Sequence, residues 1–210
     1  GGMPYDGLAQ HLLYFRSQDG GDSWDITDMK IPGCDSTLYN TIDSECYTIA
    51  ANGETVAIGV FPSWGDATLY KSSDNGDSWS ATTILDFPID KYDGNGYTVD
   101  DIPMDPNAPD SLAIFSTDGY ASMVVDDNDM AHVVFGNMYY SGINGFFYFP
   151  GTDGLSYWNE SMGSDGAQAV AFTQDFDGSG TIEVQGIAGY FLSLTSMPSI
   201  GVHTSGYLFI

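Results

Sequence analysis

Positively charged residues are nearly absent from this chain. Its 210 residues include 4 Lys+Arg against 29 Asp+Glu, which gives a formal net charge of −25. Phosphate backbones and anionic membrane surfaces repel a protein of this charge, and no basic cluster in the sequence offsets the repulsion. We therefore expect neither a nucleic-acid partner nor insertion into a membrane.

Glutamate is also scarce, because Glu occurs only at positions 45, 54, 160 and 183 and the other 25 acidic residues are Asp. Asp favours turns and caps, whereas Glu is a good helix former. With 26 Gly and 9 Pro, this composition predicts many turns and few helices. The content of 42% hydrophobic and 14% aromatic residues predicts a folded chain of one or at most two domains.

Long apolar runs are missing as well. No stretch approaches the 18 or so residues of a transmembrane helix, and the first residues show no signal peptide. The chain reads as a mature or excised segment. Its two cysteines, Cys34 and Cys46, fit neither a CxxC motif nor a common zinc pattern. They are either two free thiols or a local disulfide, and we favour the disulfide and an extracellular setting.

Short β-prone runs recur along the sequence, and no convincing helix interrupts them. The runs at 47–50 and 55–61 flank Asn52-Gly53, which is a strong hairpin signal. Other such runs lie at 11–15, 67–70, 122–125, 131–135, 145–149 and 167–172. This pattern predicts an all-β fold, either a sandwich, a barrel or a propeller.

An internal repeat favours the propeller. Residues 17–24 (motif 1) and residues 72–79 (motif 2) both follow the pattern S-x-D-x-G-D-S-W, 55 residues apart. A period of about 40–55 residues is typical of propeller blades, where each four-stranded sheet buries its faces only against its neighbours.

Both motifs resemble the Asp box, or bacterial neuraminidase repeat. This resemblance implies a sialidase-like β-propeller of four-stranded antiparallel blades, with each box in the turn between the third and fourth strands. The box is a structural staple, because its Asp accepts backbone N–H bonds, its Gly permits positive φ and its Trp packs beneath the turn. The residues that match the pattern are Ser17, Asp19, Gly21, Ser23 and Trp24 in motif 1, and Ser72, Asp74, Gly76, Ser78 and Trp79 in motif 2.

The register of the boxes divides the chain into blades. We expect a half blade at 8–31, a full blade at 47–88, an insertion at 89–120, a full blade at 121–174 and a loop with a further half blade at 175–210. A degenerate box is expected at 151–158. Two full blades and two halves make a partial propeller, so the remaining blades are expected from the same parent protein or from a partner chain.

Sialidases hold the carboxylate of their substrate with three arginines, and Arg16 is the only arginine here. The absence of this arginine triad therefore argues against sialidase activity in this chain. A glycoside hydrolase needs only two suitably spaced carboxylates, and 25 Asp residues make that count uninformative. No nucleophile elbow, HExxH, P-loop or dinucleotide motif is present.

Two groups of residues are candidates for binding. The loop at 175–183 resembles D-x-D-G-x-G calcium sites, with Asp175, Asp177, Ser179, Thr181 and Glu183 as oxygen ligands for Ca²⁺, although a plain Asp-Gly turn explains the same residues. The aromatic residues Trp64, Tyr139 and Tyr140 either stack on sugar rings or pack between blades.

Together these features predict a non-catalytic extracellular or cell-surface module that binds a glycan or a protein or serves as surface structure. The style of the sequence resembles large secreted or cell-surface proteins of aquatic bacteria. The alternative is a carbohydrate-active hydrolase whose active site is completed by blades outside this chain.

Overall fold

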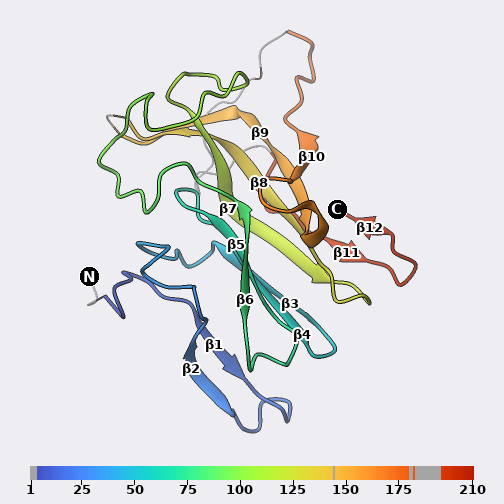
Figure 1. The fold of residues 1–210 in the computed structure, drawn as a ribbon. Helices are drawn as coiled ribbons and strands as arrows, with labels where there is room; N and C mark the ends of the chain where they lie inside the picture. The colour runs from blue at the N-terminus through green and yellow to red at the C-terminus, as the bar shows by residue number, and fades with distance from the viewer. Residues whose placement is uncertain (1–3, 144, 180–181, 183–194) are drawn as a thin grey trace.

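The computed structural model describes residues 4–143, 145–179, 182 and 195–210. Within these residues the secondary structure comprises twelve β-strands and one short 3₁₀ helix, so the predicted all-β class is confirmed. The strands form four antiparallel sheets that follow one another in chain order (Figure 1). No helix among the described residues is long and apolar enough to cross a membrane.

Two sheets have four strands and two have only two. The first two-stranded sheet pairs β1 (Leu13–Arg16) with β2 (Ile26–Lys30). The next sheet contains β3 (Tyr47–Asn52), β4 (Thr55–Val60), β5 (Ala67–Ser72) and β6 (Ser80–Leu85). The third contains β7 (Ile114–Val125), β8 (Ala131–Ser141), β9 (Phe147–Asn159) and β10 (Gln168–Phe172), with the 3₁₀ helix η1 (Glu160–Met162) after β9. The last pairs β11 (Gly201–Val202) with β12 (Leu208–Phe209).

The predicted hairpin at Asn52-Gly53 is present. Asn52 pairs with Thr55 at the end of β3 and β4, and Gly53 has a φ of +58°, which glycine adopts without steric cost. β4 is almost wholly buried because the sheet has a neighbour on each of its faces. Strands buried on both sides read as continuous apolar runs, as the sequence 56–61 does.

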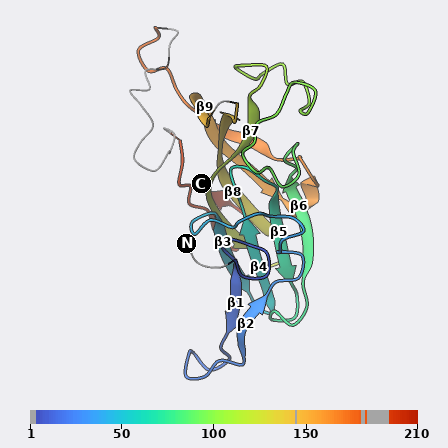
Figure 2. The same ribbon diagram turned by 90° about the vertical axis from the view of Figure 1, so that its left-hand side faces the viewer.

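Each face of the β3–β6 sheet contributes to a separate apolar core. The core shared with the β1–β2 sheet contains Tyr14, Ile58 and Tyr70, and the core shared with the β7–β10 sheet contains Leu69 and Phe135. Strand β7 contacts β3 and β4 of one neighbouring sheet and β11 of the other. The first strands of three successive sheets, β3, β7 and β11, therefore adjoin. Figure 2 shows β1 and β2 extending past β3 and β4 at one end of the molecule.

Two sequence-based boundaries were wrong. Residues 114–120, expected within the insertion, form the first part of β7, which bulges between Thr117 and Ala121. The degenerate box expected at 151–158 lies inside β9, where these residues pair with β8 and β10. The turn that follows starts instead with Asn159, whose side chain accepts from the Ser161 N–H at 3.0 Å.

The predicted disulfide is also wrong for this structure, in which Cys34 and Cys46 are free thiols in the core between the first two sheets. The Cys46 Sγ donates to the Asp43 carbonyl at 3.1 Å. Burial raises the pKa of each thiol to about 12, because an apolar core disfavours the thiolate.

Candidate functional site

Motif 1 forms a closed network of hydrogen bonds in the turn between β1 and β2. The Asp19 carboxylate accepts from the Ser23 N–H at 2.8 Å, from the Ser23 hydroxyl at 2.6 Å and from the Ser17 hydroxyl at 2.8 Å. The Ser17 Oγ in turn accepts from the Gly21 N–H at 2.7 Å. The Ser17, Asp19 and Ser23 side chains therefore all have partners inside the motif.

Motif 2 repeats this network in the turn between β5 and β6. Asp74 accepts from the Ser78 N–H at 2.8 Å, from the Ser78 hydroxyl at 2.5 Å and from the Ser72 hydroxyl at 2.7 Å. The Ser72 Oγ accepts from the Gly76 N–H at 2.7 Å, and the Trp79 indole N–H donates to the Gly76 carbonyl at 3.0 Å.

The motif carboxylates stabilise the turns that contain them. Hydrogen bonds from the serine that closes each turn are the largest of the causes that lower the pKa of Asp19 and of Asp74 to about 2. A carboxylate whose oxygens are occupied by its own turn has little capacity left for a substrate.

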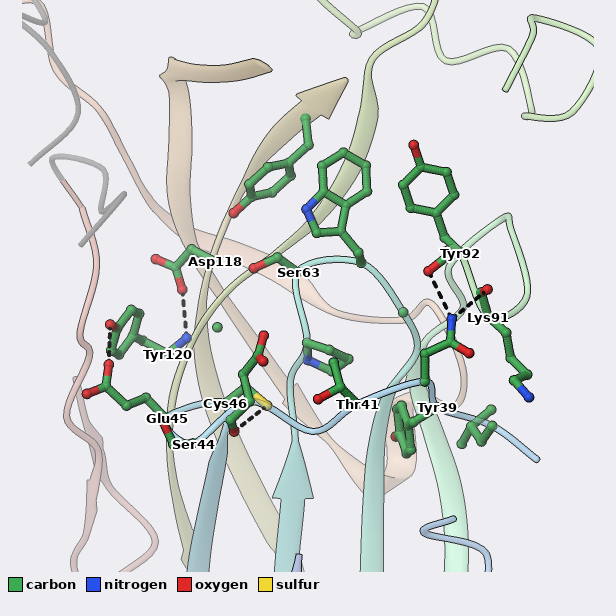
Figure 3. Close-up of a pocket in the computed structure, with 18 of the residues that line it drawn as sticks. Tyr39, Thr41, Ser44, Glu45, Cys46, Ser63, Lys91, Tyr92, Asp118 and Tyr120 are labelled. Carbon is green, nitrogen blue, oxygen red and sulfur yellow. Dashed lines mark hydrogen bonds between the residues drawn. The ribbon is translucent and has the colours of Figure 1, made fainter. Parts of the chain in front are cut away.

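A pocket of about 370 Å³ lies at the opposite end of the sheets. It is bordered by the 62–65 loop, which precedes β5, whereas motif 2 follows β5. The rest of its lining consists of residues 38–41, 43–46, 91–92 and 118–120, together with Tyr140 and Tyr148. Figure 3 shows Asp118, Tyr120 and Glu45 on one side of the pocket and Lys91 and Tyr92 on the other.

Trp64 is the centre of an aromatic cluster in the wall of this pocket. Its ring centroid lies 5.2 Å from that of Tyr92, 5.6 Å from that of Tyr140, 5.2 Å from that of Phe146 and 6.1 Å from that of Phe87. These rings hold the Trp64 ring in place from several sides. A ligand in the pocket can contact only the part of the ring that faces the pocket.

Tyr139 and Tyr140 are the other two aromatic residues predicted to contact a ligand. Their side chains lie on different sides of β8, because successive residues of a strand point to opposite faces. Tyr140 lines the pocket beside Trp64. Tyr139 does not line this pocket, and its hydroxyl donates to the Asp105 carboxylate in the segment between β6 and β7. The structure therefore brings together two of the three aromatic residues that the sequence suggested.

The acidic side of the pocket combines one buried and one exposed carboxylate. Burial raises the pKa of Asp118 to about 6, against the lowering effect of hydrogen bonds from the Ser196 hydroxyl and the Tyr120 N–H. The Tyr120 hydroxyl donates to Glu45 Oε2 at 2.8 Å and so joins β7 to the segment before β3. At pH 7 this side of the pocket is negative.

The loop predicted to bind calcium is described only in part, because Thr181 and Glu183 lie outside the described residues. Asp175 accepts from the Gly178 N–H and Asp177 from the Ser179 N–H, each at 2.9 Å, so both carboxylates bond within their own turn. Among the described residues no group of three or more His, Cys, Asp or Glu side chains is arranged to hold a metal ion. Calcium at this loop stays a prediction.

Comparisons of the chain with protein-family models, with curated proteins and with solved structures give no match. The class that the fold and the site define is an all-β protein of four-stranded antiparallel sheets with an aromatic, acidic pocket at one end.

Several pocket residues were missed by the sequence analysis. Tyr92 and Asp118 fell within the expected insertion, and Tyr120, Tyr148 and Glu45 carry no motif. One signal was available, since Asp118 interrupts a strand-like run and an Asp inside a strand calls for a special environment.

Proposed function

We propose that this chain is part of an Asp-box β-propeller. Three observations support the proposal: two full four-stranded sheets occur in sequence, the first strands of successive sheets adjoin, and motifs 1 and 2 occupy the same place in their sheets. Sheets that adjoin along their first strands and bury both faces are what a propeller would require, and this supports the proposal.

In this proposal the two-stranded sheets are incomplete blades. β1 and β2 flank motif 1 as β5 and β6 flank motif 2, so they correspond to the third and fourth strands of a blade. β11 and β12 form a hairpin like β3 and β4, and so correspond to the first and second. The missing strands come from the same parent protein or from a partner chain.

We further propose that this propeller segment is a non-catalytic extracellular or cell-surface binding module. The observation that carries this proposal is the pocket bordered by Trp64, Tyr92, Tyr120, Tyr140 and Tyr148. Aromatic rings with hydroxyl and carboxylate groups between them suit sugar rings, which present apolar faces and hydroxyl edges, or a tyrosine- and arginine-rich protein surface.

A glycan array read together with a hydrolysis assay on the same glycans tests this function. We expect binding without turnover, and about tenfold weaker binding by Tyr120→Ala, because aromatic anchors in pockets dominate affinity. Tyr207→Ala is the matched control, since Tyr207 is 69% exposed and lies outside the pocket. Equal loss in both variants contradicts the assignment of the pocket.

Asp118 favours a second function, a carbohydrate-active hydrolase completed by blades outside this chain. A buried carboxyl with a pKa of about 6 is suited to act as a general acid. Turnover by the parent protein that Asp118→Asn abolishes, with binding retained, supports the hydrolase and contradicts the non-catalytic module.

A further inference from the structure

Two buried aspartates lie on the same face of the β7–β10 sheet. Asp118 is on β7, Asp153 is on β9, and Gly136 is on β8 between them. A Cβ placed on Gly136 would lie 2.1 Å from Asp118 Oδ2, so the carboxylate fills the space of the missing side chain. Gly136 pairs with Leu155, whose side chain shares its face with that of Asp153, so both aspartates project on the Gly136 side of the sheet.

Both carboxylates are out of solvent, with Asp118 7% and Asp153 1% exposed. Asp118 accepts from the Ser196 hydroxyl and the Tyr120 N–H, and Asp153 Oδ2 accepts from the Thr195 N–H. Asp153 Oδ1 is buried and accepts from no group in the described structure. Thr195 and Ser196 are consecutive residues, so the two carboxylates bond to neighbouring groups of one segment.

No basic side chain neutralises this pair. The chain has four Lys and Arg residues, and all of them have partners elsewhere: Arg16 on Asp25 and Asp77, Lys30 on Asp6, Lys71 on Glu160 and Lys91 on the Ser36 carbonyl. His132 lies 3.4 Å from Asp126, and His11 and His203 bond within their own segments. Burying two carboxylates without a counter-charge is costly unless they share a proton or bind a cation.

We propose that Asp118 and Asp153 bind one hard cation of the Ca²⁺ type, with Ser196 Oγ as a neutral oxygen ligand. Carboxylate and hydroxyl oxygens are the ligands such ions prefer, and water completes their coordination. Asp118 also lines the pocket that contains Trp64, which gives the ion a route from solvent. The site is separate from the 175–183 loop and does not depend on the proposed binding function.

The test compares Asp153→Asn with the wild-type chain and with Asp175→Asn, which alters only the predicted calcium loop. Melting temperatures are measured in EDTA and in CaCl₂, and calorimetry with CaCl₂ counts the bound ions. For the wild type we expect calcium at about 100 times its Kd to raise the melting temperature by about 5–10 °C. Asp153→Asn should lose this rise and one bound ion, while Asp175→Asn should keep the ion at the Asp118–Asp153 site.

The sign of the effect in EDTA is a second readout. Asp153→Asn removes one of two uncompensated charges, so without calcium it should melt no lower than the wild type. Asp118→Asn provides the same comparison if Asp153→Asn does not fold. A wild type that calcium does not stabilise, or an Asp153→Asn variant that keeps the full rise and ion count, overturns the proposal and leaves a shared proton as the explanation.

Discussion

Motifs 1 and 2 share the hydrogen bonds of their Asp and Ser side chains but have different surroundings. Trp24 of motif 1 is 55% exposed, and its edge meets only Phe15 among the described aromatic residues, at 6.4 Å between centroids. Trp79 of motif 2 is half-buried and packs edge-on against Tyr14 of the preceding sheet at 5.2 Å. The network is therefore encoded locally, whereas the packing beneath it depends on a neighbouring sheet.

A basic residue before each motif reaches into the following sheet. Arg16 donates to the Asn75 carbonyl at 2.7 Å and pairs with Asp77 at 2.8 Å, both in motif 2. Lys71, in the equivalent position 55 residues later, pairs with Glu160 at 2.8 Å and donates to the Asp129 carbonyl. Motif 2 thus receives contacts from the sheet before it, which motif 1 lacks within the described residues.

The largest expected difference is between the two tryptophans. Trp79→Ala should lower the free energy of unfolding by about 3 kcal/mol, because it removes a ring that is packed on Tyr14 and on the core. Trp24→Ala should cost less than about 1 kcal/mol, since the ring is largely exposed already. Urea unfolding of both variants measures the difference, and equal losses contradict the contrast.

The two motif glycines separate backbone strain from packing. Gly76 and Gly21 have φ values of +92° and +102°, so alanine at either position costs roughly 1–2 kcal/mol of strain. A Cβ on Gly76 would also lie 2.6 Å from the Tyr14 hydroxyl, whereas a Cβ on Gly21 meets nothing within 4 Å. We expect Gly76→Ala to be about 1–3 kcal/mol worse than Gly21→Ala in the same urea assay. A Gly21→Ala loss as large as that of Gly76→Ala contradicts the packing term.

Lys71→Met tests the contact between sheets. Glu160 also accepts from the Ala131 N–H at 2.8 Å, so removing the Lys71 ammonium leaves a half-buried carboxylate with one partner fewer. We expect a loss of about 1–2 kcal/mol in thermal or urea unfolding. Lys71→Arg keeps the charge and should recover most of the loss, which a role limited to side-chain packing does not predict.

The pH response should be the same in both motifs. Hydrogen bonds from the Ser23 and Ser78 side chains and backbones are among the causes that hold the pKa of Asp19 and Asp74 at about 2, below the unfolded value of roughly 3.9. A lowered pKa in the folded state stabilises the protein above about pH 4, and this contribution is lost as the pH falls towards 2. Carboxyl NMR titration of both residues measures the midpoints, and values near 4 contradict the networks.

Thiol protection gives the smallest signal. Cys34 and Cys46 lie in the core on which Trp79 packs, and burial keeps both as thiols at neutral pH. We expect no alkylation in the native protein and two labels after unfolding. Trp79→Ala should speed labelling and Trp24→Ala should not. A native protein without labels that also gains none on unfolding without reductant has a disulfide.

The sequence predicted what is local in this fold and missed what arises between distant segments. Short runs, the turn at Gly53 and the motif carboxylates were visible because their partners lie within a few residues. The pocket was only partly visible, since Trp64 and Tyr140 meet through segments 76 residues apart. The calcium loop and the binding function stay predictions. The pairing of Asp118 with Asp153 had no sequence signal, because it depends on the register of three strands.

Every lysine and arginine side chain has a bonding partner in the fold, and this has a practical consequence for labelling and immobilisation. Each lysine bonds to a distant segment: the separation is 24 residues for Lys30, 89 for Lys71 and 55 for Lys91. Modifying a lysine with an amine-reactive dye or resin therefore breaks a tertiary contact. Thiol-reactive reagents, the usual alternative, do not reach the two buried cysteines. Carbodiimide coupling keeps this architecture intact only where it spares the exposed aspartates that hold the ion pairs and motif 1, which are Asp6, Asp19, Asp25 and Asp77.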